Sequence, residues 1–310
     1  MKTAFVFPGQ GSQAVGMGKD LCTNFAEAAA VFAEASDALG YDIQDLCFNG
    51  PKEELDKTFR TQPCILTASI AAFRVLASRG ISSDAVAGHS LGEYSAITAA
   101  EVLSLRDAVQ LTEKRGTFMQ EAVPEGKGLM AAILGLDRKK VDDLCLSVTT
   151  GYVSPANYNS PGQIVIAGEK QAVEDAMKLA KEAGAKRAIA LAVSVPSHCS
   201  LMAGASDRLF EQLKTLDMRD PSVPVVNNAD ALFLSTADSI RTSLVRQLNS
   251  PLLWEDSVRN MAAAGIDTFI EVGPGKVLSG LIRRIEPEAR LFNVEDSESL
   301  NRTLEALSAS

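Results

Sequence analysis

Short apolar runs alternate with longer amphipathic stretches along the chain. Apolar runs of about four to eight residues bounded by glycine or proline are typical of buried strands, and apolar positions three or four apart are typical of helices. Strands are therefore expected at 3–7, 85–87, 223–227, 267–272 and 291–294. Helices are expected at 19–39, 65–79, 106–122, 277–285 and 295–310. The alternation predicts an α/β fold whose mainly parallel sheet is covered by helices on both faces.

Residues 124–195 show a different order of elements. Strands are expected here at 129–135, 152–157, 163–167 and 186–192, and helices at 138–147 and 170–183. The order strand–helix–strand–strand–helix–strand is that of a ferredoxin-like unit. The sequence therefore predicts an α/β core formed by 1–123 and 196–310, into which a ferredoxin-like subdomain of 124–195 is inserted.

Composition narrows the class of protein. The chain has 310 residues and a net charge of −9, which argues against a nucleic acid as the main partner. Its first apolar run, 4–7, is too short for the core of a signal peptide, and no run is long enough for a membrane span. The five cysteines are scattered without C-x-x-C spacing, which indicates reduced thiols and no zinc site. We expect a cytoplasmic protein with no membrane partner and no metal.

The segment Gly88-His89-Ser90-Leu91-Gly92 follows an expected strand and precedes a helix-forming stretch. In a Gly-x-Ser-x-Gly turn of this kind the serine lies at a sharp bend, and glycine is needed where strand and helix approach each other. The hydroxyl then lies at a helix N-terminus, where free N–H groups and the helix dipole stabilise a developing oxyanion. Ser90 is therefore the candidate nucleophile.

A serine needs a base to act as a nucleophile at neutral pH, and the chain contains two histidines, His89 and His198. The bend turns the neighbours of Ser90 away from it, so His89 is expected to pack under the turn. His198, after Pro196 and Ser197, is then the candidate base. Because no Asp or Glu stands out as its partner, we expect a dyad whose imidazole is held by a backbone carbonyl.

Two further groups are candidates for the same site. The glycine-rich loop 8–13 would supply an N–H from Gln10, which with the N–H of Leu91 would form an oxyanion hole. Arg115 lies on the apolar stripe of the expected helix 106–122, four residues from both Leu111 and Met119. It is either an arginine that snorkels at the edge of the stripe or a guanidinium held at a pocket to pair with an anion.

Four motifs carry a family resemblance: Phe7-Pro8-Gly9-Gln10-Gly11-Ser12-Gln13, Gly88-His89-Ser90-Leu91-Gly92-Glu93-Tyr94, Arg115-Gly116 and Pro196-Ser197-His198. In this order they resemble the malonyl-CoA:acyl carrier protein transacylases of bacterial type II fatty acid synthesis. The resemblance extends from Phe5 to about Ile285. It implies a hydrolase-like core with a ferredoxin-like insert, in agreement with the order of the elements.

The resemblance also implies a role for each candidate. It implies that Ser90 carries the malonyl group, that His198 is the base and that Arg115 binds the malonate carboxylate. The backbone N–H groups of Gln10 and Leu91 are implied as the oxyanion hole. The implied reaction is a ping-pong transfer from malonyl-CoA to the phosphopantetheine thiol of acyl carrier protein. Coenzyme A enters as part of a substrate, and no permanently bound cofactor is expected.

The same resemblance implies that Gln247, in the Leu-x-x-Gln-Leu stretch 244–248, offers its backbone carbonyl to the histidine. Three alternatives stay open: an acyltransferase that loads a polyketide synthase carrier, a serine esterase, and an inactive scaffold that binds acyl-CoA. Arg115 on an inner face argues against the esterase. Since the carrier is acidic, cationic residues are expected to receive it. The candidate docking residues are Lys186, Arg187, Arg283 and Arg284, with scattered solvated charge as the alternative.

Overall fold

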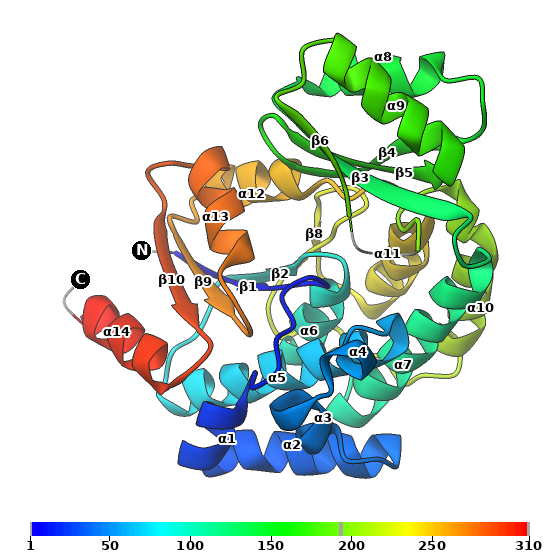
Figure 1. The fold of residues 1–310 in the computed structure, drawn as a ribbon. Coiled ribbons are helices and arrows are strands. Elements are labelled where there is room, and N and C mark those ends of the chain that lie inside the picture. Colours follow the sequence, from blue (N-terminus) through cyan, green and yellow to red (C-terminus); the bar gives the residue numbers. More distant parts are fainter. Residues whose placement is uncertain (1, 192–194, 309–310) are drawn as a thin grey trace.

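The computed structural model describes residues 2–191 and 195–308, which form two β-sheets and the helices packed around them (Figure 1). The larger sheet has six strands in the order β10-β9-β1-β2-β7-β8. They are β1 (Thr3–Phe7), β2 (Ala85–Gly88), β7 (Val225–Val226), β8 (Phe233–Leu234), β9 (Thr268–Val272) and β10 (Arg290–Val294). All pair in parallel except β8, which is antiparallel to β7. The predicted α/β fold with a mainly parallel sheet is confirmed.

The side chains of β1 alternate between the two faces of the larger sheet. Phe5 and Phe7 pack into the larger hydrophobic cluster, and Ala4 and Val6 into a smaller cluster that contains Trp254. The larger cluster receives side chains from α1 (Lys19–Asn24), α2 (Ala26–Leu39), α3 (Ile43–Asn49), α4 (Lys52–Leu55), α5 (Thr58–Ser78), α6 (Leu91–Ala99), α7 (Leu105–Ala122), α10 (Ala203–Leu213), α11 (Ala237–Asn249) and α14 (Ser297–Ser308). The smaller cluster contains α12 (Trp254–Ala263) and α13 (Val277–Ile285). Helices therefore cover both faces, as predicted.

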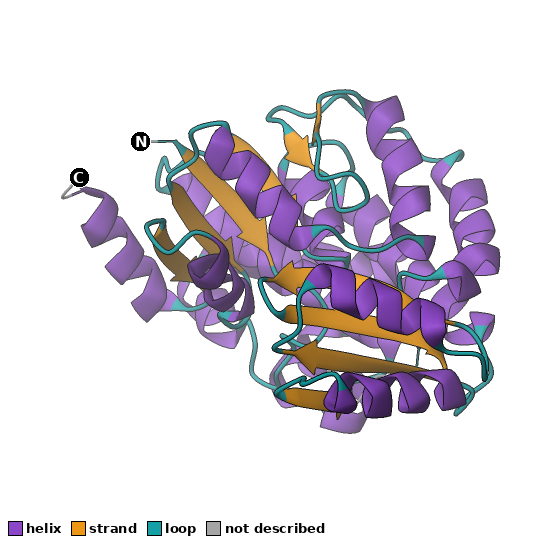
Figure 2. Cartoon of the chain, turned by 90° about the horizontal axis from the view of Figure 1, so that it is seen from above, coloured by secondary structure: helices purple, strands orange, loops and turns teal. Residues whose placement is uncertain are grey.

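The second sheet lies on one side of the first and has four antiparallel strands in the order β4-β5-β3-β6 (Figure 2). Its strands are β3 (Gly128–Leu134), β4 (Val153–Ser160), β5 (Gln163–Glu169) and β6 (Arg187–Ala190). The helices α8 (Arg138–Ser147) and α9 (Lys170–Glu182) cover its outer face. The order of elements is the predicted one; residue 192 of the expected last strand lies outside the described residues. The inner face, with Met130 and Val165, packs against Cys199 of the larger unit.

Two predicted helices have different bounds in the structure. The helix expected at 19–39 is broken at Phe25, which is extended (φ −134°). Just before the break, the side chains of Thr23 and Asn24 bond back to backbone carbonyls of their own turn, which competes with continuing the helix. The helix expected at 65–79 starts seven residues earlier, at Thr58, although Pro63 lies inside it. Most of its side chains are buried, and this packing outweighs the proline.

Other helices of the structure are not predicted by the apolar pattern of the sequence, namely α3, α4, α10, α11 and α12. Of these, α11 carries a recognisable pattern, since Ile240, Leu244 and Leu248 are buried at a spacing of four and Thr236 caps its first turn. The helix expected at 295–310 is α14, and residues 309–310 lie outside the described part. Across the described residues, no helix combines the length and apolar character that a membrane span requires.

Candidate active site

Ser90 lies at the bend between β2 and α6, as predicted. Its φ of 54° is a left-handed conformation that non-glycine residues seldom adopt. The glycines on either side permit the bend: a Cβ on Gly88 would lie 1.9 Å from the carbonyl carbon of Gly92, and one on Gly92 would lie 2.0 Å from the Phe7 oxygen. The tight contact places the serine hydroxyl at the N-terminus of α6.

His198 faces this hydroxyl. Its Nε2 lies 2.8 Å from Ser90 Oγ, and its Nδ1 lies 2.8 Å from the backbone oxygen of Gln247. Nδ1–H therefore donates to the carbonyl, which leaves Nε2 free to accept the serine proton. Burial, and then the positive charge of Arg115, lowers the pKa of His198 to about 3. The imidazole is thus neutral at physiological pH, as a base must be.

Arg115 is 1% exposed, so it does not snorkel to the surface. Nη1 donates to Gln62 Oε1 at 2.7 Å, while Nη2 lies 3.0 Å from Gln247 Oε1 and 3.2 Å from Ser90 Oγ. In the described part of the chain, no carboxylate forms a salt bridge with the guanidinium. The arginine is held by neutral amides, and its positive charge is available to an anion beside Ser90.

The predicted oxyanion donors lie around the bend. Leu91 is the first residue of α6, so its N–H has no partner within the helix. Gln10 follows Gly9, which approaches the bend so closely that a Cβ there would lie 2.3 Å from the His89 backbone oxygen. Both the Gln10 loop and Ser90 line one cavity. The loop and the helix N-terminus are therefore adjacent, as an oxyanion hole requires.

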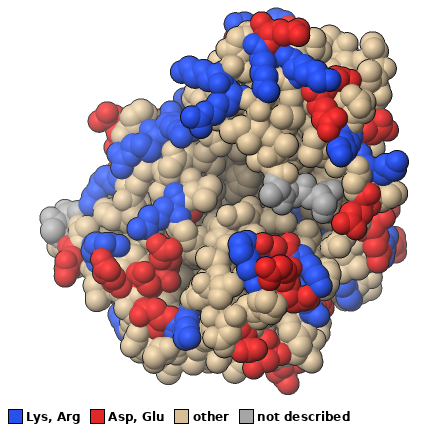
Figure 3. Space-filling view, in the orientation of Figure 1, with Lys and Arg blue, Asp and Glu red and all other residues tan. Residues whose placement is uncertain are grey.

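This cavity has a volume of about 230 Å³ and lies between the larger sheet and the inner face of the second sheet. The space-filling view in Figure 3 shows a hollow near the centre of the face that is turned to the reader. Its apolar lining residues are Met119, Met130, Val165, Leu191, Val195, Val277, Leu278 and Leu281. His89 also lines it, and its Nε2 lies 2.8 Å from Asn159 Oδ1 while its ring packs on Trp254. His89 is therefore part of the wall and is not simply packed under the turn.

With this geometry established, the chain can be compared with known proteins. Residues 4–292 match the model of the acyl transferase domain. The chain belongs to the acyl transferase family. It is 55% identical to the malonyl CoA-acyl carrier protein transacylase of Escherichia coli (strain K12) over 284 residues, which is 91% of this chain and 92% of that protein. It is 46% identical to the transacylase of the same name from Bacillus subtilis (strain 168), over 99% and 97% of the two chains.

Solved structures give the same result. An acyl carrier protein S-malonyltransferase from Vibrio cholerae superposes with a TM-score of 0.96 at 49% identity, covering 98% of this chain and all of that one. A malonyl-transacylase in complex with the acyl-carrier protein of a type II polyketide synthase superposes with a TM-score of 0.97 at 50% identity, over 99% and 100% of the chains. The resemblance that the four motifs indicate is confirmed.

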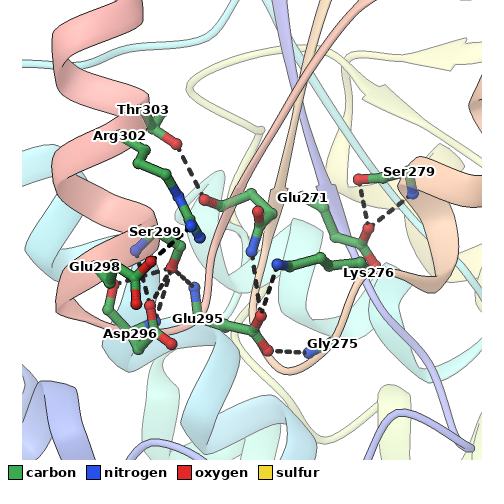
Figure 4. A network of polar contacts seen from close by, with 11 residues as sticks. Glu271, Gly275, Lys276, Ser279, Glu295, Asp296, Glu298, Ser299, Arg302 and Thr303 are labelled. Atoms are coloured by element: carbon green, nitrogen blue, oxygen red, sulfur yellow. Dashed lines mark hydrogen bonds and ion pairs between the residues drawn. The ribbon is translucent and has the colours of Figure 1, made fainter.

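In this acyl transferase, α13 forms one wall of the cavity, and a buried carboxylate fixes its N-terminus (Figure 4). Glu271, at the end of β9, accepts hydrogen bonds from the backbone N–H groups of Leu278 and Ser279 and from the Ser279 hydroxyl. Glu295, which directly follows β10, accepts a hydrogen bond from the backbone N–H of Gly275 in the loop between β9 and α13. The wall is therefore anchored at its base.

The four predicted docking residues are exposed. Arg284 donates to Gln163 Oε1 at 2.6 Å, and Gln163 lines the cavity. The residue before Gln163 is Gly162, whose carbonyl accepts a hydrogen bond from the backbone N–H of Gly135. The side chain of Lys186 packs against Gly135. Figure 3 shows Lys and Arg side chains in a band from the α13 side to the second sheet. Arg284 and Lys186, one residue of each predicted pair, thus both lie near the turn between β4 and β5, next to the cavity-lining Gln163.

Three buried polar residues of the site were not singled out in the sequence: Gln62, Glu93 and Asn228. Asn228 Oδ1 accepts from the backbone N–H of Ser90, and its Nδ2 donates to the oxygen of Gly88, so it ties both ends of the bend together. A lone glutamine in the apolar run 62–76 could have indicated Gln62. In the described residues, no group of three or more His, Cys, Asp or Glu could hold a metal ion.

Proposed function

We propose that this chain transfers the malonyl group of malonyl-CoA to the phosphopantetheine thiol of acyl carrier protein, through an ester on Ser90. The observation that carries the proposal is the position of one oxygen. Ser90 Oγ lies within 2.8 Å of a neutral imidazole nitrogen and 3.2 Å of a buried guanidinium. A hydrolase needs only the contact between the serine and the imidazole. An enzyme that transfers an acyl group ending in a carboxylate also needs the guanidinium beside the serine.

In the first half-reaction, Ser90 Oγ attacks the thioester carbonyl and its proton moves to Nε2 of His198. The carbonyl oxygen becomes an oxyanion, which the N–H groups of Gln10 and Leu91 stabilise. When the tetrahedral intermediate collapses, the carbon–sulfur bond breaks and the coenzyme A sulfur takes the proton from His198. A malonyl ester on Ser90 remains.

The second half-reaction reverses these steps with a different thiol. His198 takes the proton of the phosphopantetheine thiol, whose sulfur attacks the ester carbonyl. The ester bond breaks, and the proton passes from His198 to the leaving Ser90 oxygen. Throughout, the carbonyl of Gln247 keeps the imidazole in the tautomer that both steps require.

Arg115 selects the acyl group in this proposal. A carboxylate buried without a partner would cost several kcal/mol, and a guanidinium offers it two parallel N–H donors. The apolar cavity lining keeps water away, so the pair is weakly screened and the serine ester is protected from hydrolysis.

The finer assignments belong to the same proposal. Coenzyme A is bound as part of a substrate, the enzyme works in the cytoplasm, and its product supplies fatty acid synthesis. Residues 124–195 act as an inserted subdomain that covers the site on a core of 1–123 and 196–310. A carrier of a polyketide synthase is the second candidate acceptor, which the likeness to a transacylase bound to such a carrier favours.

Intact-protein mass spectrometry tests the proposal. Wild-type protein mixed with malonyl-CoA is expected to gain one malonyl group, located by peptide mapping on Ser90 and lost on addition of the carrier with its thiol arm. Ser90→Ala removes a single oxygen and is expected to remain folded and unlabelled. A label that persists in Ser90→Ala, or binding of acyl-CoA with no covalent label in the wild type, would contradict the proposal. Steady hydrolysis without transfer would indicate an esterase.

A further inference from the structure

Glu93 is a fully buried carboxylate beneath the bend of Ser90. Its Oε2 accepts two hydrogen bonds, from the backbone N–H of Asn228 at 3.0 Å and from Nε2 of Gln247 at 2.9 Å. It lies on α6 one turn after the nucleophile and is not among the residues that line the cavity. Toward these two donors Oε2 acts only as an acceptor, whether or not the other oxygen carries a proton, so it imposes a direction on the group that faces it.

The group that it directs is the side-chain amide of Gln247. Nε2 of this amide donates to Glu93 Oε2 and to the backbone oxygen of Ser90 at 2.9 Å. The Oε1 end then faces Arg115 and accepts from Nη2 at 3.0 Å. In the opposite orientation the amide would turn its NH2 group to the guanidinium and its oxygen to the carboxylate, and both contacts would be repulsive. Glu93 thus decides which end of Gln247 meets the arginine.

The orientation of Gln247 matters because Arg115 makes few other hydrogen bonds, although its guanidinium also lies 5.1 Å from the centre of the Tyr94 ring. Gln62 holds Nη1, and the arginine Nε has no hydrogen-bond partner in the described residues. With both amide oxygens in place, Nη2 is directed at Ser90 Oγ. Without the oxygen of Gln247, Nη2 loses the acceptor that keeps it at the bend.

We propose that Glu93 is a positioning residue for acyl selectivity: through the side-chain amide of Gln247 it aims Arg115 at the acyl group carried by Ser90. The inference rests on the proposed function, since it assigns Arg115 to the acyl carboxylate. It adds a relay of three side chains from α6 through α11 to α7. A role confined to folding would instead weaken the transfer of every acyl group alike.

The test is competition between malonyl-CoA and acetyl-CoA for Ser90, measured by mass spectrometry as the ratio of initial labelling rates. Glu93→Ala is expected to lower the malonyl-to-acetyl ratio by about 10-fold to 100-fold, the effect of losing one hydrogen bond to a charged group. Glu93→Gln can place its oxygen where Oε2 lies, so it is expected to keep most of the ratio. Thr303→Ala is the control for the loss of a buried polar contact, because Thr303 is also buried but its hydroxyl donates to the backbone oxygen of Asn293, and neither residue lines the cavity. It is expected to keep the ratio.

A double-mutant cycle tests the route through Gln247. Gln247→Met keeps the backbone carbonyl that holds His198 and removes the amide, so it is expected to lower the ratio as much as Glu93→Ala does. In the Gln247→Met background, Glu93→Ala is expected to change the ratio no further. An unchanged ratio in Glu93→Ala or Gln247→Met, or a full additional loss in the double variant, overturns the proposal.

A crystal structure of Glu93→Ala gives a readout that does not depend on activity. We expect the hydrogen bond between Gln247 and Arg115 to be lost, and its retention overturns the proposal. Should Glu93→Ala fail to fold, Gln247→Met alone decides by its ratio. The failure of the proposed function is separately visible, since the wild type would then carry no malonyl label on Ser90.

Discussion

Nη2 of Arg115 lies 3.2 Å from Oγ of Ser90, so the guanidinium donates to the nucleophile itself. In the proposed reaction, attack on a carbonyl takes this oxygen into an ester, and the terminal carboxylate of the malonyl group replaces it as the acceptor for the arginine. An acetyl group offers no such acceptor and would leave the buried cation without its second partner. The contact therefore links the chemistry at the serine to the choice of acyl group.

Arg115→Ala is expected to lose most malonyl transfer and to gain acetyl transfer relative to it. Breaking one side of a buried charge pair costs about 3–5 kcal/mol, which corresponds to a factor of at least 100 in selectivity. Arg115→Lys is expected to recover part of the loss, because an ammonium cannot make two parallel bonds. The measurement is competition between the two thioesters for Ser90. A malonyl preference that survives in Arg115→Ala would show that the carboxylate binds elsewhere.

The sequence predicts well those parts of the site whose conformation is set locally. The bend at Ser90 follows from two glycines at fixed spacing, and the choice of His198 follows from the small number of histidines. The partner of its imidazole, the carbonyl of Gln247, lies on α11, a helix that the pattern analysis does not predict. The family resemblance implies this residue, whereas nothing in its local sequence places it near His198.

Long-range polar contacts could not be predicted from local patterns. Glu93 and Asn228 are 135 positions apart, and their hydrogen bond forms only when the second residue after β7 lies against α6. The break at Phe25 has a different, local cause: the side chains of Thr23 and Asn24 bond to the carbonyls of their own turn, and hydrophobic periodicity does not reveal this. The mainly parallel sheet and the helices on both its faces, by contrast, follow from short apolar runs such as 3–7 that alternate with amphipathic stretches.

The pH profile of acylation provides a second prediction. An unperturbed histidine has a pKa of about 6.5, whereas burial and the charge of Arg115 lower the pKa of His198 to about 3. The base therefore stays unprotonated as the pH falls from 8 to 5. The rate of malonyl transfer to Ser90 is measured by rapid quench in the Glu93→Gln variant, because burial raises the pKa of Glu93 to about 7 and its titration would overlap that of a histidine. The rate is expected to show no midpoint near pH 6.5. A tenfold loss of rate between pH 7 and 5.5 would contradict this.

A malonyl carboxylate bound to Arg115 also offsets part of the positive charge that lowers the pKa of His198. The imidazole then becomes a stronger base when the cognate acyl group is present. We therefore expect the ratio of the acylation rates with malonyl-CoA and acetyl-CoA to exceed the ratio of the association constants of the two thioesters. Equal ratios of rate and of binding would show that the carboxylate has no effect on the base.

A third prediction concerns stability. Burial raises the pKa of Glu93 to about 7, so folding favours its protonated form. Its contribution is therefore fully present below pH 4.5, the unfolded value, and is lost as the pH rises through about 7. At pH 8 the loss amounts to about 3 kcal/mol. Glu93→Gln, which cannot ionise, is expected to gain stability relative to wild type over this window, measured by urea unfolding. A difference that stays constant from pH 4 to 8 would contradict the assignment.

The last prediction concerns the carrier. The chain itself has a net charge of −9, so an acidic carrier is repelled unless it meets a local cationic surface. Arg284 reaches Gln163 at the cavity mouth, and Arg283 adjoins it on the last turn of α13. In the proposed reaction the phosphopantetheine arm enters this cavity to reach Ser90, so a carrier bound at Arg283 and Arg284 would hold its arm close to the site.

Reversing Arg283 and Arg284 to Glu is expected to raise the KM for the carrier about tenfold at low salt and to leave acylation by malonyl-CoA nearly unchanged. The difference from wild type is expected to shrink as salt is added, because screening weakens contacts between exposed charges. The matched control reverses Lys139 and Lys140, an adjacent exposed pair on α8 at the outer face of the second sheet, away from the cavity. Since both pairs change the net charge equally, a larger effect at α13 reports a local docking surface. Equal effects of the two reversals would instead show that only the overall charge matters, and an unchanged KM in both would place docking elsewhere.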